Sequence, residues 1–395
     1  MPFSSSSSSS SLNMAKPLSP PPSLLVLLLV LLVLVTCPYA PHVRAHCNFG
    51  DNQGRHSKVK GMFVFGSSLM DNGNNNLLGK TAKANYKPYG IDFPLGLLGR
   101  FTNGRNVVDL LGEYLELPSL IPPFADPETK GPKAINGVDF ASGGSGILDD
   151  TGSIVGQVTS LSQQIRNFEG VTLPDLEAQV GCPSGESLLG NHVFVVGTGS
   201  NDYTFNYFLS ANRKHPLLRS FTANLISSLS LELQKLYKLG GRKFVLMAIN
   251  PIGCSPMAKA RLPMRVGCLQ VLNQAAHLFN AELKSLVDDL NAKLPGSHFV
   301  FVNSYKIVQD IIKDPTSHGF NDTTSPCCEV ASFKDGGNGV SCKRGGRVCT
   351  DRSSYVFFDG LHPTEAVNVQ IATKAFTSNL TTEVYPINVK NLGEA

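Results

Sequence analysis

The chain contains four short stretches that are apolar at nearly every position, and each is followed by a turn rich in Gly, Ser or Asn. These stretches are residues 62–65, 192–196, 243–249 and 298–302. A strand without polar alternation is buried on both faces, which is typical of a parallel sheet. In such a sheet the reactive residues lie at the carboxyl ends of the strands, where these turns fall.

Apolar residues at helical spacing lie between and after these strands. One stripe recurs every three or four residues through Leu225, Leu229, Leu233 and Leu236, and Gly240-Gly241 closes it. A longer stripe covers 271–294 and ends at Pro295-Gly296. A last helix is expected to begin after Pro363 and to reach about Thr377. Strands that alternate with helices predict one α/β domain with a parallel sheet, and we interpret the stripes as core faces.

The first 45 residues have the pattern of a secretory signal peptide. A serine tract and Lys16 precede the apolar run Leu24 to Val35, which is 12 residues long. A membrane-spanning helix needs about 20 apolar residues, so this run better suits a signal peptide. Val43-Arg44-Ala45 then predicts cleavage after Ala45. The alternative is an anchor that stays in the membrane.

The composition narrows the class of protein. Of the 395 residues 42% are hydrophobic and 16% are charged, which excludes a mostly disordered chain. The formal charge is only +4, and no dense run of Lys or Arg occurs, so nucleic-acid binding is not expected. Residues 46–395 are expected to form a single domain.

Cysteine usage agrees with export. Cys37 leaves with the signal peptide, and the eight remaining are Cys47, Cys182, Cys254, Cys268, Cys327, Cys328, Cys342 and Cys349. An even number in an exported chain predicts disulfides, although the last four could also suggest a zinc site. We interpret residues 317–354 as a disulfide-stapled surface segment. Asn321 and Asn379 begin N-x-[ST] sequons and are expected glycosylation sites.

The turn after the first strand carries two adjacent serines, Ser67 and Ser68. A serine that follows a buried strand and enters a helix is exposed, and its N–H lies at a helix N-terminus, where negative charge is favoured. This position suits a nucleophile whose developing oxyanion needs donors. A helix-capping serine in a polar turn is the commoner alternative.

Three further motifs contain candidate functional groups. Residues 137–146 are rich in small side chains, but no apolar strand run directly precedes Gly143, and the pattern does not match a dinucleotide fingerprint. Asn201 lies in the turn after the second strand, where its amide can donate a hydrogen bond. Asp359 and His362 lie three residues apart before Pro363, so the carboxylate can reach the imidazole and orient it.

Taken in order, these motifs resemble the four blocks of the plant-type GDSL esterase/lipase family, a branch of the SGNH hydrolases. The blocks are Phe63-Val64-Phe65-Gly66-Ser67-Ser68-Leu69-Met70-Asp71, Phe140-Ala141-Ser142-Gly143-Gly144, Gly199-Ser200-Asn201-Asp202-Tyr203 and Asp359-Gly360-Leu361-His362-Pro363-Thr364. The resemblance implies a three-layer α/β/α fold with a central parallel sheet in a flavodoxin-like arrangement. It also implies a Ser-His-Asp esterase that needs no cofactor and no metal.

The resemblance assigns a role to each candidate. Ser68 would be the nucleophile, and Asp359 and His362 would relay its proton. The backbone of Ser68, the backbone of Gly143 and the amide of Asn201 would form the oxyanion hole. Three positions depart from the family pattern, because Ser67 replaces the name-giving Asp, Asp139 replaces an Asn and Phe358 replaces a Trp. Ser67 also competes as a second, disfavoured nucleophile.

We therefore expect a secreted, extracellular serine esterase or lipase of the cell wall or apoplast that acts on an ester substrate. No stable transmembrane segment is expected after signal cleavage. Two alternatives remain open. One is a catalytically weak or inactive secreted binding protein on the same fold, motivated by Ser67. The other is an esterase of acetylated cell-wall polysaccharide.

Overall fold

The structure is a computed structural model that describes residues 59–181, 188–209, 216–260, 267–332 and 337–395. All of these residues belong to one compact unit of the chain, residues 49–395. The expected signal peptide, residues 1–45, lies outside the described residues, as do Cys37, Cys47 and Cys182. Among the helices of the described part, none is long and apolar enough to cross a membrane.

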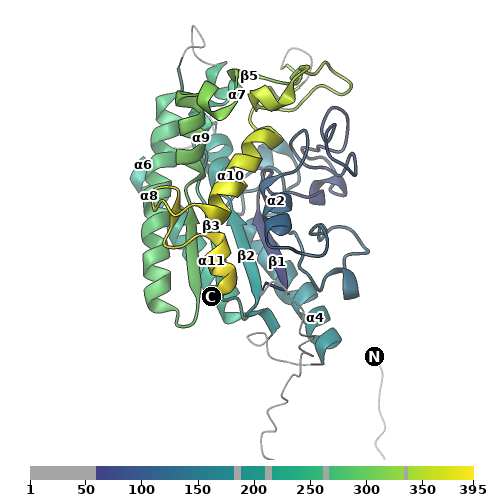
Figure 1. Ribbon diagram of the computed structural model, residues 1–395, viewed down its shortest axis with the longest axis vertical. Coiled ribbons are helices and arrows are strands. Elements are labelled where there is room, and N and C mark those ends of the chain that lie inside the picture. Colours follow the sequence, from purple (N-terminus) through teal and green to yellow (C-terminus); the bar gives the residue numbers. More distant parts are fainter. Residues whose placement is uncertain (1–58, 182–187, 210–215, 261–266, 333–336) are drawn as a thin grey trace, which may run out of the picture. The chain divides into compact units, whose positions relative to one another are not determined.

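A five-stranded sheet forms the centre of this unit, and its strand order is β1-β2-β3-β4-β7 (Figure 1). The four apolar runs form the parallel strands β1 (Gly61–Gly66), β2 (His192–Gly197), β3 (Lys243–Met247) and β4 (His298–Val302). Every residue of β1, β2 and β3 is buried, so the predicted two-sided burial is confirmed. The short strand β7 (Val384–Tyr385) pairs with β4 in the antiparallel sense.

An extended segment runs beside the free edge of β1, at residues 136–142. It exchanges backbone hydrogen bonds with the strand, among them Val64 N–H to Val138 O (3.0 Å) and Phe140 N–H to Val64 O (2.8 Å). Counting this segment gives the spatial order 2-1-3-4-5 that is characteristic of flavodoxin-like sheets. No apolar strand pattern precedes Gly143, yet residues 136–142 run along β1 and place the glycine-rich turn that follows them at the end of this strand.

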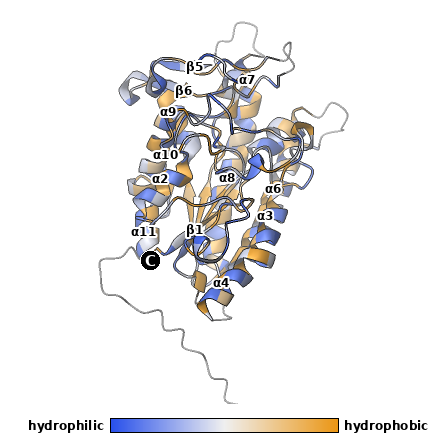
Figure 2. Cartoon of the chain, turned by 90° about the vertical axis from the view of Figure 1, so that its right-hand side faces the viewer, coloured by the Kyte–Doolittle hydropathy of each residue, from blue (hydrophilic) through white to orange (hydrophobic). Residues whose placement is uncertain are grey.

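Helices cover both faces of the sheet (Figure 2). One face is covered by α3 (Leu161–Asn167), α4 (Leu173–Val180), α6 (Leu218–Lys238) and α8 (Gln270–Lys293). The other face is covered by α2 (Val107–Tyr114), α9 (Ser304–Lys313), α10 (Glu365–Thr377) and α11 (Val389–Glu394). Alternate residues of β1 point to opposite layers, because Phe63 and Phe65 join one core and Met62 and Val64 the other. The expected three-layer α/β/α class is confirmed.

The predicted helices are present with small shifts at their ends. The leucine stripe predicted around 225–236 is the buried face of α6, and the 271–294 stripe is the buried face of α8. The helix expected after Pro363 is α10. These helices pack their apolar faces on the sheet, as their spacing predicts.

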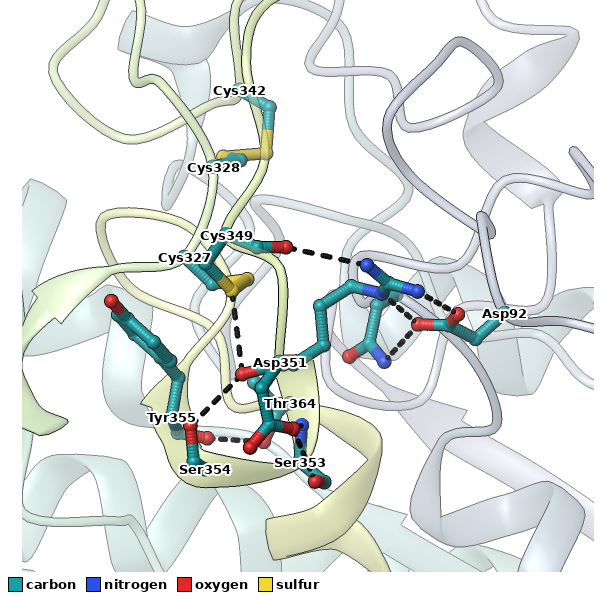
Figure 3. The surroundings of a disulfide bond; sticks show 12 residues. Asp92, Cys327, Cys328, Cys342, Cys349, Asp351, Ser353, Ser354, Tyr355 and Thr364 are labelled. Atoms are coloured by element: carbon teal, nitrogen blue, oxygen red, sulfur yellow. Dashed lines mark hydrogen bonds and ion pairs between the residues drawn. A yellow bond between two sulfur atoms is a disulfide. The ribbon is translucent and has the colours of Figure 1, made fainter. Parts of the chain in front are cut away.

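The segment at 317–354 is held by disulfides, as expected. Cys327 is bonded to Cys349 and Cys328 to Cys342, while Cys254 is bonded to Cys268 further back in the chain. Strands β5 (Asp322–Pro326) and β6 (Tyr355–Phe357) flank the stapled segment and pair with each other. Figure 3 shows the two neighbouring disulfides, and the Arg352 guanidinium binds Asp92 at 2.5 and 2.7 Å on a distant loop. Because disulfides use all four sulfurs of the 327–349 cluster, no thiolate is left there for zinc.

Candidate active site

Ser68, His362 and Asp359 form one continuous chain of hydrogen bonds. The Ser68 Oγ atom lies 2.8 Å from His362 Nε2, and His362 Nδ1 lies 2.8 Å from Asp359 Oδ2. All three side chains are buried, with exposed fractions of 8%, 4% and 0%. The fold therefore brings together a hydroxyl and an imidazole that are 294 residues apart in the chain.

The turn 359–362 fixes its own carboxylate. Asp359 Oδ1 accepts hydrogen bonds from the N–H groups of Leu361 (2.8 Å) and His362 (2.7 Å). The Phe358 N–H donates to the His362 carbonyl at 2.8 Å and closes the turn. Because these bonds occupy Oδ1, Oδ2 is the oxygen that faces the imidazole. The local spacing thus produces the contact that the sequence predicts.

Gly66 is the last residue of β1 and directly precedes the turn that contains Ser67 and Ser68. Its φ is +153°, and a Cβ at this position would lie 2.2 Å from the Gly197 carbonyl oxygen on β2. Only glycine therefore lets the two strand ends approach so closely. The buried Gln164 side chain bonds both the N–H (2.8 Å) and the carbonyl (2.9 Å) of Gly66. These contacts hold the strand end from which Ser67 and Ser68 project.

The expectation that Ser68 enters a helix is wrong. Residues 67–70 form a turn closed by the Met70 N–H to Ser67 O bond (3.0 Å), and the only helical element described between residues 59 and 77 is the three-residue η1 (Asn74–Asn76). The reason is the polar run that follows. Asp71 Oδ1 accepts from the N–H groups of Gly73 (2.8 Å) and Asn74 (2.7 Å), and such local bonds compete with helical ones.

The carboxylate of Asp71 also uses the donor that was expected in the oxyanion hole. The Gly143 N–H donates to Asp71 Oδ2 at 2.9 Å, inside the loop. Burial raises the pKa of Asp71 to about 6, although the hydrogen bonds from Gly73, Gly143 and Asn74 act in the opposite direction. Gly143 therefore holds the serine turn against the second motif, and its N–H already has an acceptor.

Asp139, which stands where the family has Asn, accepts two backbone hydrogen bonds. Its Oδ2 accepts from the Asn72 N–H (2.6 Å) and its Oδ1 from the Ala141 N–H (2.8 Å). Burial, and secondly the neighbouring Asp71, raise the pKa of Asp139 well above its usual range. The substitution thus keeps the serine turn tied to the strand edge at 136–142.

Two donors other than Gly143 remain near Ser68. The Asn201 side-chain amide donates to the Ser145 carbonyl at 2.8 Å, which fixes its orientation and leaves its second hydrogen. Gly144, with φ of +91°, lines a cavity together with Ser68, Asn201 and His362. Within the described residues the Gly144 N–H has no hydrogen-bond partner, and neither has the Ser68 N–H. The resemblance assigned this role to Gly143, because the sequence does not show which of two adjacent glycines has an N–H that is already bonded.

The cavity beside Ser68 has a volume of about 190 Å³ and a largely apolar lining. Its apolar side chains include Phe101, Ile154, Val155, Phe205 and Met257. Such a lining with a few convergent polar groups is typical of a small-molecule site.

A second cavity, of about 60 Å³, adjoins Ser68 and His362 and is also lined by Ser67, Thr198 and Asn250. Thr198 Oγ1 and Asn250 Oδ1 are buried, and neither has a hydrogen-bond partner in the described part of the chain. Ser67 therefore lines a small, mostly apolar hollow that contains these two polar atoms. The hydroxyl bonded to His362 Nε2 is that of Ser68.

The remaining expected sites can be placed on the surface. Asn321 and Asn379 are both exposed, as glycan acceptors must be. In the part of the chain that the structure describes, no three His, Cys, Asp or Glu side chains gather in a way that could hold a metal ion.

Fold and site define a class: an α/β protein with a buried Ser-His-Asp hydrogen-bond chain at the carboxyl edge of a mostly parallel sheet. The profile of the GDSL-like lipase/acylhydrolase family matches residues 62–375. The chain belongs to this family, and carboxylic ester hydrolase, the expected enzyme class, is confirmed at this level.

Two relatives that are similar in sequence agree with the family assignment. Two proteins of Arabidopsis thaliana named GDSL esterase/lipase are 42% and 39% identical to this chain, over 340 and 342 residues. The alignments cover 85% and 86% of this chain and 91% and 92% of those proteins. A solved mutant of an acetyl-xylooligosaccharide esterase from Geobacillus is 15% identical, with a TM-score of 0.35, over 80% of this chain and 91% of that one.

Proposed function

We propose that this protein hydrolyses carboxylic esters through a covalent acyl-enzyme formed on Ser68. The observation that supports this most directly is the pair of 2.8 Å contacts that join Ser68 Oγ, His362 and Asp359. A nucleophile bonded to a base, with the base oriented by a third group, is the arrangement that activates a serine.

The reaction has two halves. His362 Nε2 takes the hydroxyl proton while Ser68 Oγ attacks the ester carbonyl carbon, and the imidazolium then gives that proton to the departing alcohol oxygen as the C–O bond breaks. In the second half, His362 takes a proton from water, the hydroxide attacks the acyl carbon, and Ser68 recovers its proton as the acid leaves. Asp359 keeps Nε2 facing Ser68 and stabilises the imidazolium.

We further propose that the oxyanion is held by the N–H groups of Ser68 and Gly144 and by the Asn201 amide. Gly144 replaces the expected Gly143, because the Gly143 N–H is already bonded to Asp71. Each donor that is aimed at the developing negative charge is worth about 3 kcal/mol.

The test of the nucleophile is a pair of adjacent variants. Ser68→Ala should lower turnover of a short-chain nitrophenyl ester by several orders of magnitude, roughly as in other serine hydrolases, and should abolish labelling by a fluorophosphonate probe. Ser67→Ala removes a hydroxyl of the same turn that does not contact the imidazole, so it should keep labelling at Ser68. Unchanged turnover in Ser68→Ala would refute the proposal.

The substrate proposed for the site is an ester with an aliphatic or aromatic group. The apolar lining of the 190 Å³ cavity supports this choice over a sugar ring. Esters of graded acyl length, assayed beside acetylated xylan, distinguish the two. Preference for acetylated xylan would favour the polysaccharide alternative.

A second candidate function is a secreted binding protein with little catalysis. Ser67 motivates it, since the family's Asp is absent and Thr198 Oγ1 lacks a partner among the described residues in the hollow that Ser67 lines. The fluorophosphonate probe separates the two functions, because a protein that only binds stays unlabelled at Ser68.

We also propose that the protein is exported to the extracellular space. The signal-peptide pattern of residues 1–45 supports this proposal, and so do three disulfides, which persist in oxidising compartments. The amino-terminal sequence of the secreted protein should begin at His46. An intracellular protein that retains residues 1–45 would contradict the proposal.

A further inference from the structure

The hydroxyl of Tyr89 contacts the carboxylate of Asp359 although the two residues are 270 positions apart. Tyr89 is fully buried, and its hydroxyl donates to Asp359 Oδ2 at 2.7 Å. The same oxygen lies 2.8 Å from His362 Nδ1. One carboxylate oxygen therefore receives two donors, one from the imidazole and one from a tyrosine of a remote loop.

The direction of the Tyr89 proton is fixed by a third group. The Cys342 N–H donates to the Tyr89 hydroxyl oxygen at 3.1 Å. Because that N–H occupies an acceptor position of the oxygen, the hydroxyl hydrogen is left for the carboxylate. Tyr89 thus acts as a donor to Asp359 and not as an acceptor.

The disulfide-stapled segment supports this arrangement from the other side. Cys342 is bonded to Cys328, and the Cys328 N–H donates to the Phe358 carbonyl at 2.8 Å, directly before Asp359. The Gly360 N–H donates to the Val340 carbonyl at 2.8 Å, directly after it. The segment therefore holds the backbone on both sides of Asp359 as well as the hydroxyl that binds its side chain.

Aromatic side chains pack against the Tyr89 ring. Its ring stands edge-on to Phe101 and Phe358, with centroids 6.1 and 5.7 Å away. Phe101 in turn lies 5.1 Å from the His362 ring. Edge-to-face pairs of this kind stabilise a buried core and fix ring direction.

We propose that Tyr89 is a positioning residue for Asp359, and that the Cys328–Cys342 segment holds its hydroxyl in place. This inference rests on the proposed function, in which Asp359 orients the catalytic imidazole. The hydroxyl also withdraws negative charge from Oδ2 and so limits how strongly Asp359 stabilises the imidazolium.

Few other ionisable groups of the described chain face this carboxylate. Tyr86 lies on the same loop as Tyr89, and the centroids of the two rings are 5.3 Å apart. The Arg344 guanidinium lies over the Tyr86 ring, 4.0 Å from its centroid. Burial and the charge of Asp359 raise the pKa of Tyr89 well above its ordinary value, so it stays a neutral donor across the working range. His362 lies on the same turn as Asp359.

Tyr89→Phe removes the hydroxyl and keeps the ring. Without that donor Oδ2 attracts the imidazolium more strongly, so the acid limb of the kcat/KM profile should move to higher pH. Asp359 also loses one of the hydrogen bonds that hold its carboxylate in place. We expect kcat to fall about tenfold, which is the rate factor that corresponds to one hydrogen bond to a charged group, while KM changes less than about twofold.

Tyr86→Phe is the matched control. The Tyr86 hydroxyl donates to the carbonyl of the same Cys342 at 2.8 Å and not to Asp359. It should leave the acid limb and kcat close to those of the natural protein. The proposal is overturned if Tyr89→Phe and Tyr86→Phe have the same acid limb and the same kcat.

A second substitution covers the case in which Tyr89→Phe folds poorly. Replacement of Tyr89 by 3-fluorotyrosine keeps the shape and makes the hydroxyl a stronger donor, so the acid limb should move in the opposite direction, to lower pH. An unmoved limb argues against the proposal.

The role of Tyr89 can be tested even if the proposed function is wrong. If the natural protein neither turns over esters nor labels at Ser68, the proposed function fails. The Nδ1 proton of His362, followed by NMR in the natural protein and in the two Tyr89 variants, then still answers the question. Its hydrogen bond to Asp359 Oδ2 should strengthen in Tyr89→Phe and weaken in the 3-fluorotyrosine variant, because both donors share that oxygen. The same Nδ1 proton signal in all three overturns the role of Tyr89.

Discussion

The Asn201 amide offers the sharpest test of how the site stabilises charge. Asn201 is buried, and one of its hydrogens is held by the Ser145 carbonyl at 2.8 Å. The cavity that it lines with Ser68 and His362 leaves the second hydrogen for the substrate oxygen. Asn201→Ala removes both interactions, and the two losses appear in different measurements.

The size of each loss follows from its surroundings. The bond to Ser145 exists in the free protein, so its removal leaves a buried carbonyl unpaired and should lower the free energy of unfolding by about 1–3 kcal/mol. The bond to the oxyanion forms only in the transition state, so its loss should lower kcat by about 10²- to 10³-fold with little change in KM.

The assay is kcat and KM on a short-chain nitrophenyl ester, with thermal unfolding measured in parallel. Asn206→Ala is the matched control, because Asn206 lies in η5 (Asp202–Tyr207), the helical segment that Asn201 caps, and bonds Asp150 at 3.1 Å outside the cavity lining. Asn206→Ala should leave kcat within about threefold, far below the loss of one oxyanion donor. If Asn201→Ala retains kcat to the same extent, Asn201 is not an oxyanion donor and the oxyanion hole must be reassigned.

Two other perturbations test neighbouring features. Ser67→Asp places a carboxylate in the hollow where Thr198 Oγ1 has no partner among the described residues. The carboxylate should accept a hydrogen bond from the Thr198 hydroxyl, hold the serine turn more firmly and raise kcat several-fold. A lower kcat in a variant that unfolds at the same temperature would contradict this. Burial raises the pKa of Asp202 from 3.8 to about 6, so the folded protein binds a proton there more tightly than the unfolded chain. That contribution is complete below pH 3.8 and is lost as the pH rises through about 6. The difference in unfolding free energy between the natural protein and Asp202→Asn should therefore fall by about 2 kcal/mol between pH 4 and pH 7. A difference that stays constant with pH in chemical denaturation would show that Asp202 titrates normally.

Much of the fold follows from local patterns. The four apolar runs became the parallel strands because a run without polar positions can only be buried on both faces. Helices α6 and α8 followed from the spacing of their apolar residues, and α10 from its start after Pro363. The segment at 136–142 was not foreseen, because its pairing with β1 depends on backbone bonds that any sequence can make.

In the candidate site, too, some features could be predicted from the sequence and others could not. Asp359 and His362 could be paired from sequence, since three residues of chain bring them together. The helix expected at Ser68 was wrong because the Asp71 side chain takes the backbone N–H groups that a helix would use. The choice between Gly143 and Gly144 depends on which N–H already has an acceptor, and that acceptor, Asp71, lies 72 residues away.

The sequence by itself determined the four parallel strands, helices α6, α8 and α10 and the Asp359–His362 turn, because each depends on residues within a few positions of one another. Only the tertiary structure decided that Ser68 meets His362, that Gly144 is the glycine with a free N–H among the described residues, and that Tyr89 binds Asp359. The physical reason is that these outcomes depend on contacts between residues 72 to 294 positions apart in the chain. Their geometry is set by how the strand ends and the disulfide-stapled segment pack, and no local spacing encodes it.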